Sequence, residues 1–103
     1  MELLVFGKDV KLTPSVRFLI RTATDHLEAH FRHMLSAQWD LAFERFEIRV
    51  SCRLHARSGF YRASSRSKKL RTAVDDVVQK IQTQRRRKKV IVLRARRQSA
   101  RKR

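Results

Sequence analysis

Cysteine, proline and glycine are scarce in this sequence, which has one cysteine, one proline and two glycines in 103 residues. Because Cys52 is the only cysteine, an intrachain disulfide is excluded, as fits a reducing compartment. Gly7 and Gly59 lie far apart, so there is no glycine-rich loop of the kind that cradles nucleotide phosphates. The apolar run at residues 3–6 is too short for a secretory signal or a membrane span. We therefore expect a cytoplasmic protein without a membrane partner.

Acidic residues are also few, since nine Asp and Glu stand against 26 Lys and Arg, giving a net charge of +17. Residues 1–84 hold all nine acids and carry +6, whereas residues 85–103 hold eleven basic residues and no acid. The apolar content of 42% is enough for one folded domain. We expect a domain at residues 1–89, a basic and flexible tail at residues 90–103, and a polyanionic partner, with nucleic acid first.

Apolar periodicity predicts a strand and then a helix in the first third of the chain. Residues 3–6 are apolar on both faces, as in a strand with neighbours on both sides. Thr13 is placed to cap a helix that begins with Pro14, where the missing N–H of proline has no cost. From there, apolar residues recur at steps of three and four as far as Phe31.

A two-residue period follows in the middle of the chain. Residues 35–44 and 46–54 alternate apolar and polar side chains, and each segment predicts a strand with one apolar and one solvated face. The first segment could instead prolong the preceding helix. The dipeptide at residues 58–59 predicts a turn, and residues 60–65 a third strand with Tyr61, Ala63 and Ser65 facing inward.

A last helix is predicted after Ser67, its N-cap, with an apolar stripe that runs to Ile81. Beyond Gln84 the stripe ends, and we expect the helix to fray. Residues 90–93 are apolar again and could extend the helix, add an edge strand or become ordered on a partner. The order β-α-β-β-β-α predicts an α+β fold, a four-stranded antiparallel meander with two helices packed on one face, layered like a double-stranded-RNA-binding domain.

Basic residues gather on both predicted helices. Interaction with the helix dipole explains one or two cations at a helix C-terminus, but not five in succession at residues 85–89. We interpret the excess as phosphate contacts, which position a protein without reading sequence. For the first helix, a solvated face with an i,i+4 pair between Arg21 and Asp25 is the alternative. The predicted RNA-binding residues are Arg17, Arg21, Lys68, Lys69, Arg71, Lys80, Gln84, Arg85, Arg86, Arg87, Lys88 and Lys89.

A secondary RNA-binding surface is predicted on the open face of the sheet. Arg49, Arg53 and Arg62 should project from it, and like charges on neighbouring strands are unfavourable unless an anion binds. The tail residues of this secondary set are Arg94, Arg96 and Arg97.

Other reactive residue types have structural explanations. His26, His30 and His33 have the spacing of a helical zinc pair, but no further ligand completes a site, and surface histidines are the simpler interpretation. Cys52 and Trp39 fall on the apolar side of strands, which predicts core residues rather than a reactive thiol or a base-stacking platform. Since no acid, base and nucleophile converge, we expect neither an enzyme nor a metal or cofactor.

Several residues match a known family in type and spacing over nearly all of residues 1–89. In the N-terminal part these are Gly7, Val10, Thr13, Val16, Arg17, Leu27, Glu28 and Phe31. In the C-terminal part they are Tyr61, Arg62, Ala63, Ser64, Ala73, Val74, Asp75, Lys80, Ile81, Gln84, Arg87 and Lys89. With these residues the chain resembles the short form of the ribosome hibernation promoting factors, also described as ribosome-associated translation inhibitors or sigma-54 modulation proteins.

The resemblance implies a protein that binds the small ribosomal subunit and its rRNA where mRNA and tRNAs sit, silencing and protecting idle ribosomes. It implies a short-form member without the dimerisation domain of long forms, monomeric away from the ribosome. Ala23 and His26 replace lysines common in relatives, and Arg62 and Arg66 stand where many relatives are neutral or acidic, which could shift binding toward other RNA. The alternatives are a general double-stranded or structured RNA-binding module, or a protein-interaction regulator in which residues 90–93 add a strand to a partner.

Overall fold

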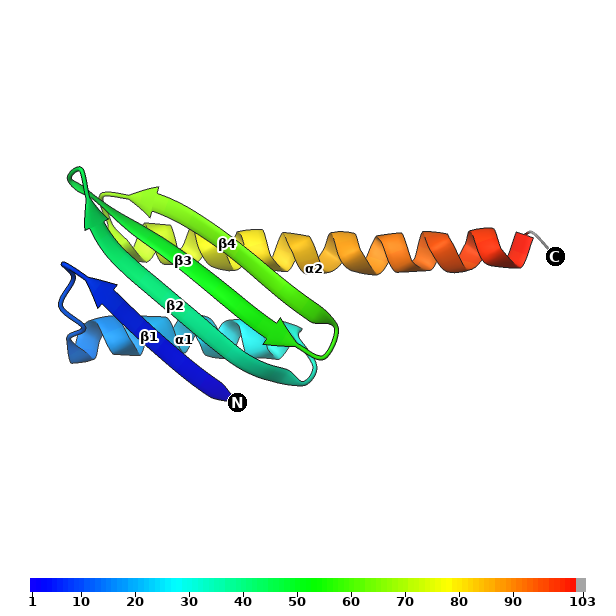
Figure 1. Cartoon of the computed structure of the whole chain (residues 1–103), viewed down its shortest axis with the longest axis horizontal. Helices are drawn as coiled ribbons and strands as arrows, with labels where there is room; N and C mark the ends of the chain where they lie inside the picture. The colour runs from blue at the N-terminus through cyan, green and yellow to red at the C-terminus, as the bar shows by residue number, and fades with distance from the viewer. Residues whose placement is uncertain (102–103) are drawn as a thin grey trace.

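The computed structural model describes the backbone of residues 1–101 and the side chains of residues 1–87. Its elements are β1 (Glu2–Lys8), α1 (Pro14–His30), β2 (Met34–Glu44), β3 (Glu47–Ala56), β4 (Gly59–Ser67) and α2 (Leu70–Arg101). The strands form one sheet in the order β1-β2-β3-β4, and both helices lie on the same face of it (Figure 1). The predicted α+β fold with two helices on one face is confirmed.

One strand pairing differs from the predicted antiparallel meander, because β1 runs parallel to β2. Parallel neighbours need a crossover connection, and here α1, with its 17 residues, carries the chain back along the sheet before β2 begins. The prediction of two neighbours for β1 is also wrong, since β1 is an edge strand. Leu4 and Phe6 pair with Gln38 and Asp40, so they project from the face of the sheet that the helices leave open and are 39% and 50% exposed.

The segment at residues 35–44 is a strand, so its helical alternative is wrong. An irregularity in the register between Met34 and Ser36 reverses the expected alternation where β2 begins. Met34 is therefore buried, whereas Leu35, which was predicted to face inward, is 51% exposed.

The tip of the hairpin between β2 and β3 also departs from the predicted pattern. Glu44 pairs with Glu47, so Phe46 belongs to a two-residue turn and not to β3. Phe43 and Phe46, both predicted to be inward, are 48% and 85% exposed as a result.

The predicted start of α1 is confirmed, whereas that of α2 is not. Thr13 Oγ1 accepts a hydrogen bond of 3.3 Å from the Val16 N–H, and the single proline lies in the first turn of α1. α2 begins at Leu70, and the hydroxyl of Ser67 accepts a hydrogen bond from the Lys69 N–H instead of capping the helix. Ser67 ends β4, so residues 68–69 are needed to turn the chain before α2.

α2 does not end near Gln84 but continues to Arg101, and it projects beyond the sheet (Figure 1). Residues 90–93 thus extend the helix and form no edge strand. The side chains of residues 88–103 lie outside the described residues, and the flexibility expected of residues 90–103 stays a prediction. In the part of the chain that the structure describes, no helix combines the length and apolar character needed to cross a membrane.

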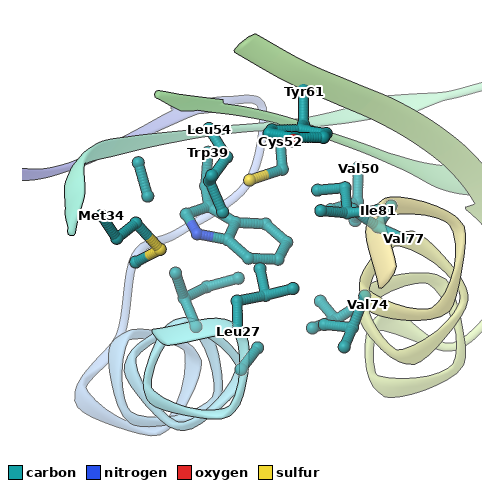
Figure 2. Packing of buried hydrophobic residues seen from close by; sticks show 14 of the residues in the cluster. Leu27, Met34, Trp39, Val50, Cys52, Leu54, Tyr61, Val74, Val77 and Ile81 are labelled. Carbon is teal, nitrogen blue, oxygen red and sulfur yellow. The ribbon is translucent and has the colours of Figure 1, made fainter. Parts of the chain in front are cut away.

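The core lies between the sheet and the helix pair, with Trp39 at its centre (Figure 2). The indole ring of Trp39 points away from β2 toward the helices, with Leu27 of α1 below it and Val74 of α2 to one side. Trp39 and Cys52 are both 0% exposed, so their prediction as core residues is confirmed. Tyr61 is buried on β4 between exposed neighbours, as the predicted alternation requires.

Candidate nucleic-acid interface

A groove of ≈ 460 Å³ lies where the end of α1 meets the middle of α2. It is lined by His30, Gln82, Arg85 and Arg86, and by no acidic residue. The two helices run in the same direction on one face of the sheet, so the C-terminus of α1 lies beside α2 (Figure 1). Because the carbonyl end of a helix carries partial negative charge, it favours cations such as Arg85 nearby.

The groove has hydrogen-bond donors available for an anion. Gln82 Nε2 is buried and has no hydrogen-bond partner among the described residues. A buried donor left unpaired costs about 1–3 kcal/mol, and a ligand oxygen would remove this cost only if the Gln82 side chain turned toward the groove. Arg85 and Arg86 add two planar guanidinium groups, which match phosphate oxygens in pairs. The arrangement is chemically suited to a phosphate group.

The three successive arginines at this part of α2 do not share one direction. Neighbouring residues on a helix point about 100° apart. Arg85 is half-buried, whereas Arg86 and Arg87 are exposed. Arg87 therefore presents its charge outside the groove. The side chains of Lys88, Lys89, Arg94, Arg96 and Arg97 lie outside the described residues.

The other predicted helix residues gather at the opposite end of the helix pair. Arg71 and Arg85 are separated by about 21 Å along α2, at 1.5 Å for each residue. α1 begins at the same end as α2 (Figure 1), so the start of α1 joins Arg71 and not the groove. All members of this N-terminal basic group are exposed: Arg17, Arg21, Lys68, Lys69 and Arg71. The structure thus separates the predicted residues into two groups.

Lys80 and Gln84 were predicted to bind RNA, but both have partners within the chain. Lys80 Nζ donates to the carbonyl of Ser64 at 2.9 Å, and Gln84 Nε2 donates to the carbonyl of Arg62 at 2.6 Å. These carbonyls belong to β4, which is an edge strand. The two side chains therefore cover polar groups that an edge strand otherwise leaves open.

Few acids neutralise the cations of the body. Among residues 1–87 the only ion pairs are Lys80–Asp76 and Arg66–Glu44. The hydroxyl of Ser65 donates to Asp76 at 2.6 Å, and this bond, followed by the one from Lys80, lowers the pKa of Asp76. Arg21 and Asp25 do not form the i,i+4 pair considered as the alternative. Arg17 Nε donates to the carbonyl of Leu12 at 3.2 Å, and the remaining basic side chains of residues 1–87 have no acidic partner there.

On the open face of the sheet, Arg49, Arg53 and Arg62 are exposed, as predicted. Arg53 lies directly opposite Arg62 across β3 and β4. Arg66, which lies opposite Arg49, was not among the predicted residues. Residues of β3 and β4 at equal distances from the turn at residues 57–58 lie opposite each other. The pairing of Arg49 with Arg66 could therefore have been predicted from the sequence.

The histidines of α1 do not assemble a metal site. Within the described part of the chain, no three His, Cys, Asp or Glu side chains are placed to hold a metal ion. The rings of His26 and His30 contact each other edge to face at 5.4 Å, and His33 lies beyond α1 with a φ of 56°. Of the three, His30 alone lines the groove, a role that was not foreseen.

Comparisons with known proteins agree with this fold. Residues 3–90 match the family model described as Sigma 54 modulation protein / S30EA ribosomal protein. The chain is similar to the N-terminal domain of Thermus thermophilus Protein Y, with a TM-score of 0.74 and 19% identity over 82% of this chain and 94% of that one. It is similar to a ribosomal subunit interface protein from Coxiella burnetii, with a TM-score of 0.73 and 17% identity over 87% and 99%. No curated protein matches the sequence.

Proposed function

The chain belongs to the Sigma 54 modulation protein / S30EA ribosomal protein family, and from this membership we propose that it is a ribosome-associated protein. In the finer form of the proposal, it binds the small subunit in the mRNA and tRNA channel through rRNA phosphates, and thereby inactivates and protects idle ribosomes. One structural neighbour is itself described as a ribosomal subunit interface protein, which supports the coarser statement. In this proposal the protein acts by binding and catalyses no reaction.

The observation that carries the finer proposal is the acid-free groove between α1 and α2. Arg85 and Arg86 can each bind a phosphate through two donors, and Gln82 and His30 line the same groove. Such contacts recognise the shape of folded RNA, because its phosphates and sugars carry no sequence information. A folded rRNA surface offers the dense phosphates that this groove requires.

The N-terminal basic group supplies a second contact on the same side of the molecule. Arg71 of this group and Arg85 of the groove are about 21 Å apart along α2. Two separated contacts fix orientation as well as position. We infer that the helix pair, and not the sheet, faces the rRNA of the channel.

Ribosome binding by charge-matched variants tests the proposal. We compare R85Q/R86Q with R45Q/R57Q, in which two exposed arginines of the hairpin turns are changed, so both variants lose two charges. Co-sedimentation with small subunits should weaken about tenfold or more for R85Q/R86Q and by less than about twofold for R45Q/R57Q, because each lost phosphate contact removes a counterion-release contribution. Equal losses in both variants would reject the groove as the contact.

Two competition experiments test the channel itself. Small subunits loaded beforehand with mRNA and initiator tRNA should exclude the protein if it occupies their channel. Free duplex RNA should compete poorly. Equal affinity for free duplex RNA and for small subunits would instead support a general RNA-binding module.

Deletion of residues 90–103 separates the body from the tail. Because those residues are basic, we expect weaker binding with a smaller dependence on salt, but an unchanged preference for small subunits. Complete loss of ribosome binding with an unchanged circular dichroism spectrum would assign recognition to the tail and contradict the proposal.

A further inference from the structure

The face of the sheet opposite the helices is covered by no described element, and its side chains form an ordered array. Cross-strand pairs of β3 and β4 give four rows, which run in order as Arg49 with Arg66, Ser51 with Ser64, Arg53 with Arg62, and His55 with Phe60. We call these eight residues the arginine face. Rows are two residues apart, so successive rows lie about 7 Å apart and the two arginine rows about 13 Å apart.

The two arginine rows place like charges in direct opposition, which destabilises a sheet. Only Arg66 has an acidic partner, Glu44, at 4.0 Å, and both side chains are about half exposed. Asp40, the acid of the neighbouring strand on this face, instead accepts a hydrogen bond of 3.2 Å from the Gln38 side chain. Asp40 keeps its charge in this bond and lines the same groove as Arg49 and Arg53, so it relieves part of the repulsion. Arg53 and Arg62 form no ion pair within residues 1–87, and a bound polyanion would remove the repulsion that remains.

The arginine face is hollowed along its length. An open groove of ≈ 800 Å³ extends from β4 across to β1, and its charged lining residues are Lys8, Arg49, Arg53 and Arg62 with the acids Asp40 and Glu44. A second hollow of ≈ 470 Å³ is lined by the Arg53–Arg62 row together with His55 and Phe60. Because the two hollows share Arg53 and Arg62, they adjoin at this row, and we call the two together the track.

The aromatic row provides a stacking surface at the end of this track. The rings of His55 and Phe60 are stacked, with centroids 4.2 Å apart and an angle of 10° between planes. Phe60 is nevertheless 79% exposed, so its other face is free. An exposed aromatic ring stacked on its cross-strand neighbour offers a face on which an unpaired nucleic-acid base can stack.

We propose that the arginine face is a second RNA-binding surface, which binds a single-stranded segment with phosphates on the two arginine rows and a base on Phe60. A duplex offers phosphates but keeps its bases stacked inside, and an acidic peptide has no base to stack, so neither uses the aromatic row. This surface lies on the opposite side of the molecule from the helix pair. The proposal does not depend on ribosome association.

Fluorescence anisotropy of the full chain with a labelled single-stranded oligouridine tests the proposal at about 50 mM salt, where such contacts are strong. R53Q/R62Q should weaken binding at least tenfold and lower the salt slope by about 1.4, at about 0.7 for each phosphate contact on a single strand. R45Q/R57Q, with the same change of charge in the two hairpin turns and outside the eight residues of the face, should change affinity less than about twofold. Far-UV circular dichroism and the melting temperature confirm that each variant is folded.

Phe60→Leu tests the aromatic row without changing charge. We expect at least about a fivefold loss of affinity for the oligouridine, as for removal of one base-stacking ring, and no change for a duplex of the same length. Equal losses in R53Q/R62Q and R45Q/R57Q, or an unaffected Phe60→Leu, would overturn the proposal. The proposal would also be overturned if a polyglutamate peptide bound the wild type more tightly than the oligouridine does and if R53Q/R62Q no longer bound that peptide.

The two proposals fail separately in these measurements. If only the helix pair contacts RNA, R53Q/R62Q retains small-subunit binding and binds the oligouridine no more weakly than R45Q/R57Q does, which overturns the arginine face alone. If the ribosome proposal is wrong, small subunits are not bound, while the losses in R53Q/R62Q and Phe60→Leu for the oligouridine persist.

Discussion

The indole N–H of Trp39 donates a 3.0 Å hydrogen bond to Thr24 Oγ1, and this bond joins the sheet to α1 inside the core. The Thr24 hydroxyl donates in turn to the carbonyl of Ile20 at 2.8 Å. Thr24 is the only polar side chain among the buried residues described. It satisfies the one polar atom of the largest core residue, which a purely apolar helix face would leave unpaired.

Replacement of Thr24 by valine should destabilise the protein by about 1–3 kcal/mol, because valine has the same shape but leaves the indole N–H buried without an acceptor. Thr22→Val is the matched control, since Thr22 makes the same type of hydroxyl bond to a backbone carbonyl, that of Phe18, at an exposed position. Its effect should stay within about 0.5 kcal/mol. Urea unfolding followed by the fluorescence of Trp39 measures both, and equal effects would show that the indole bond contributes nothing.

Local sequence signals predicted much of this fold. The cap at Thr13 and the placement of Trp39 and Cys52 in the core depend on residues a few positions apart, so spacing alone reveals them. The parallel pairing of β1 with β2 depends on where α1 returns the chain, which no spacing records. The irregularity beside Met34 similarly shifts one strand against its neighbour, and only the pairing of two strands defines it.

The sequence predicts which basic residues are candidates for the site, but not which of them lie together in the folded protein. The basic residues are visible in the sequence, but the distance between Arg71 and Arg85 follows from helix geometry, and the proximity of His30 to Arg85 follows from helix packing. Lys80 and Gln84 look free in sequence because their acceptors are backbone carbonyls 16 and 22 residues earlier. No side-chain pattern marks a carbonyl as open on an edge strand.

Cys52 should make the stability of the protein fall in alkaline solution. Burial raises the pKa of its thiol from 9.0 to about 12. Between pH 9 and pH 12 the Cys52 thiol is therefore ionised in the unfolded chain but neutral in the folded protein. The neutral thiol's contribution is complete below pH 9 and is lost as the pH rises toward 12, by up to about 1.4 kcal/mol for each pH unit. Urea unfolding at pH 7 and at about pH 10.5 should therefore show a larger loss for the wild type than for Cys52→Ala. Parallel losses in the two proteins would show that the thiol is not shielded.

Gln84→Ala should destabilise the protein by about 0.5–1.5 kcal/mol, since it removes the hydrogen bond to the carbonyl of Arg62. It should also increase self-association, because an uncovered edge strand can pair with another chain. Gln79→Ala is the control, as Gln79 is exposed on the same helix and its side chain makes no hydrogen bond within residues 1–87. Urea unfolding and sedimentation velocity at rising concentration measure the two effects. A variant as stable and monomeric as the control would mean that Gln84 does not protect β4.

The turn between β2 and β3 can be stabilised by substitution. Arg45 and Phe46 have φ values of 49° and 66°, a left-handed conformation that costs side-chain-bearing residues free energy and that Asn-Gly adopts readily in two-residue hairpin turns. Phe46 is 85% exposed, so its removal forfeits little burial. We expect R45N/F46G to gain about 1–2 kcal/mol in thermal or urea unfolding. Arg57→Asn, in the other hairpin turn at a residue without positive φ, should change stability by less than about 0.5 kcal/mol. A loss of stability in R45N/F46G would indicate that the exposed ring of Phe46 makes contacts worth more than the relief of backbone strain.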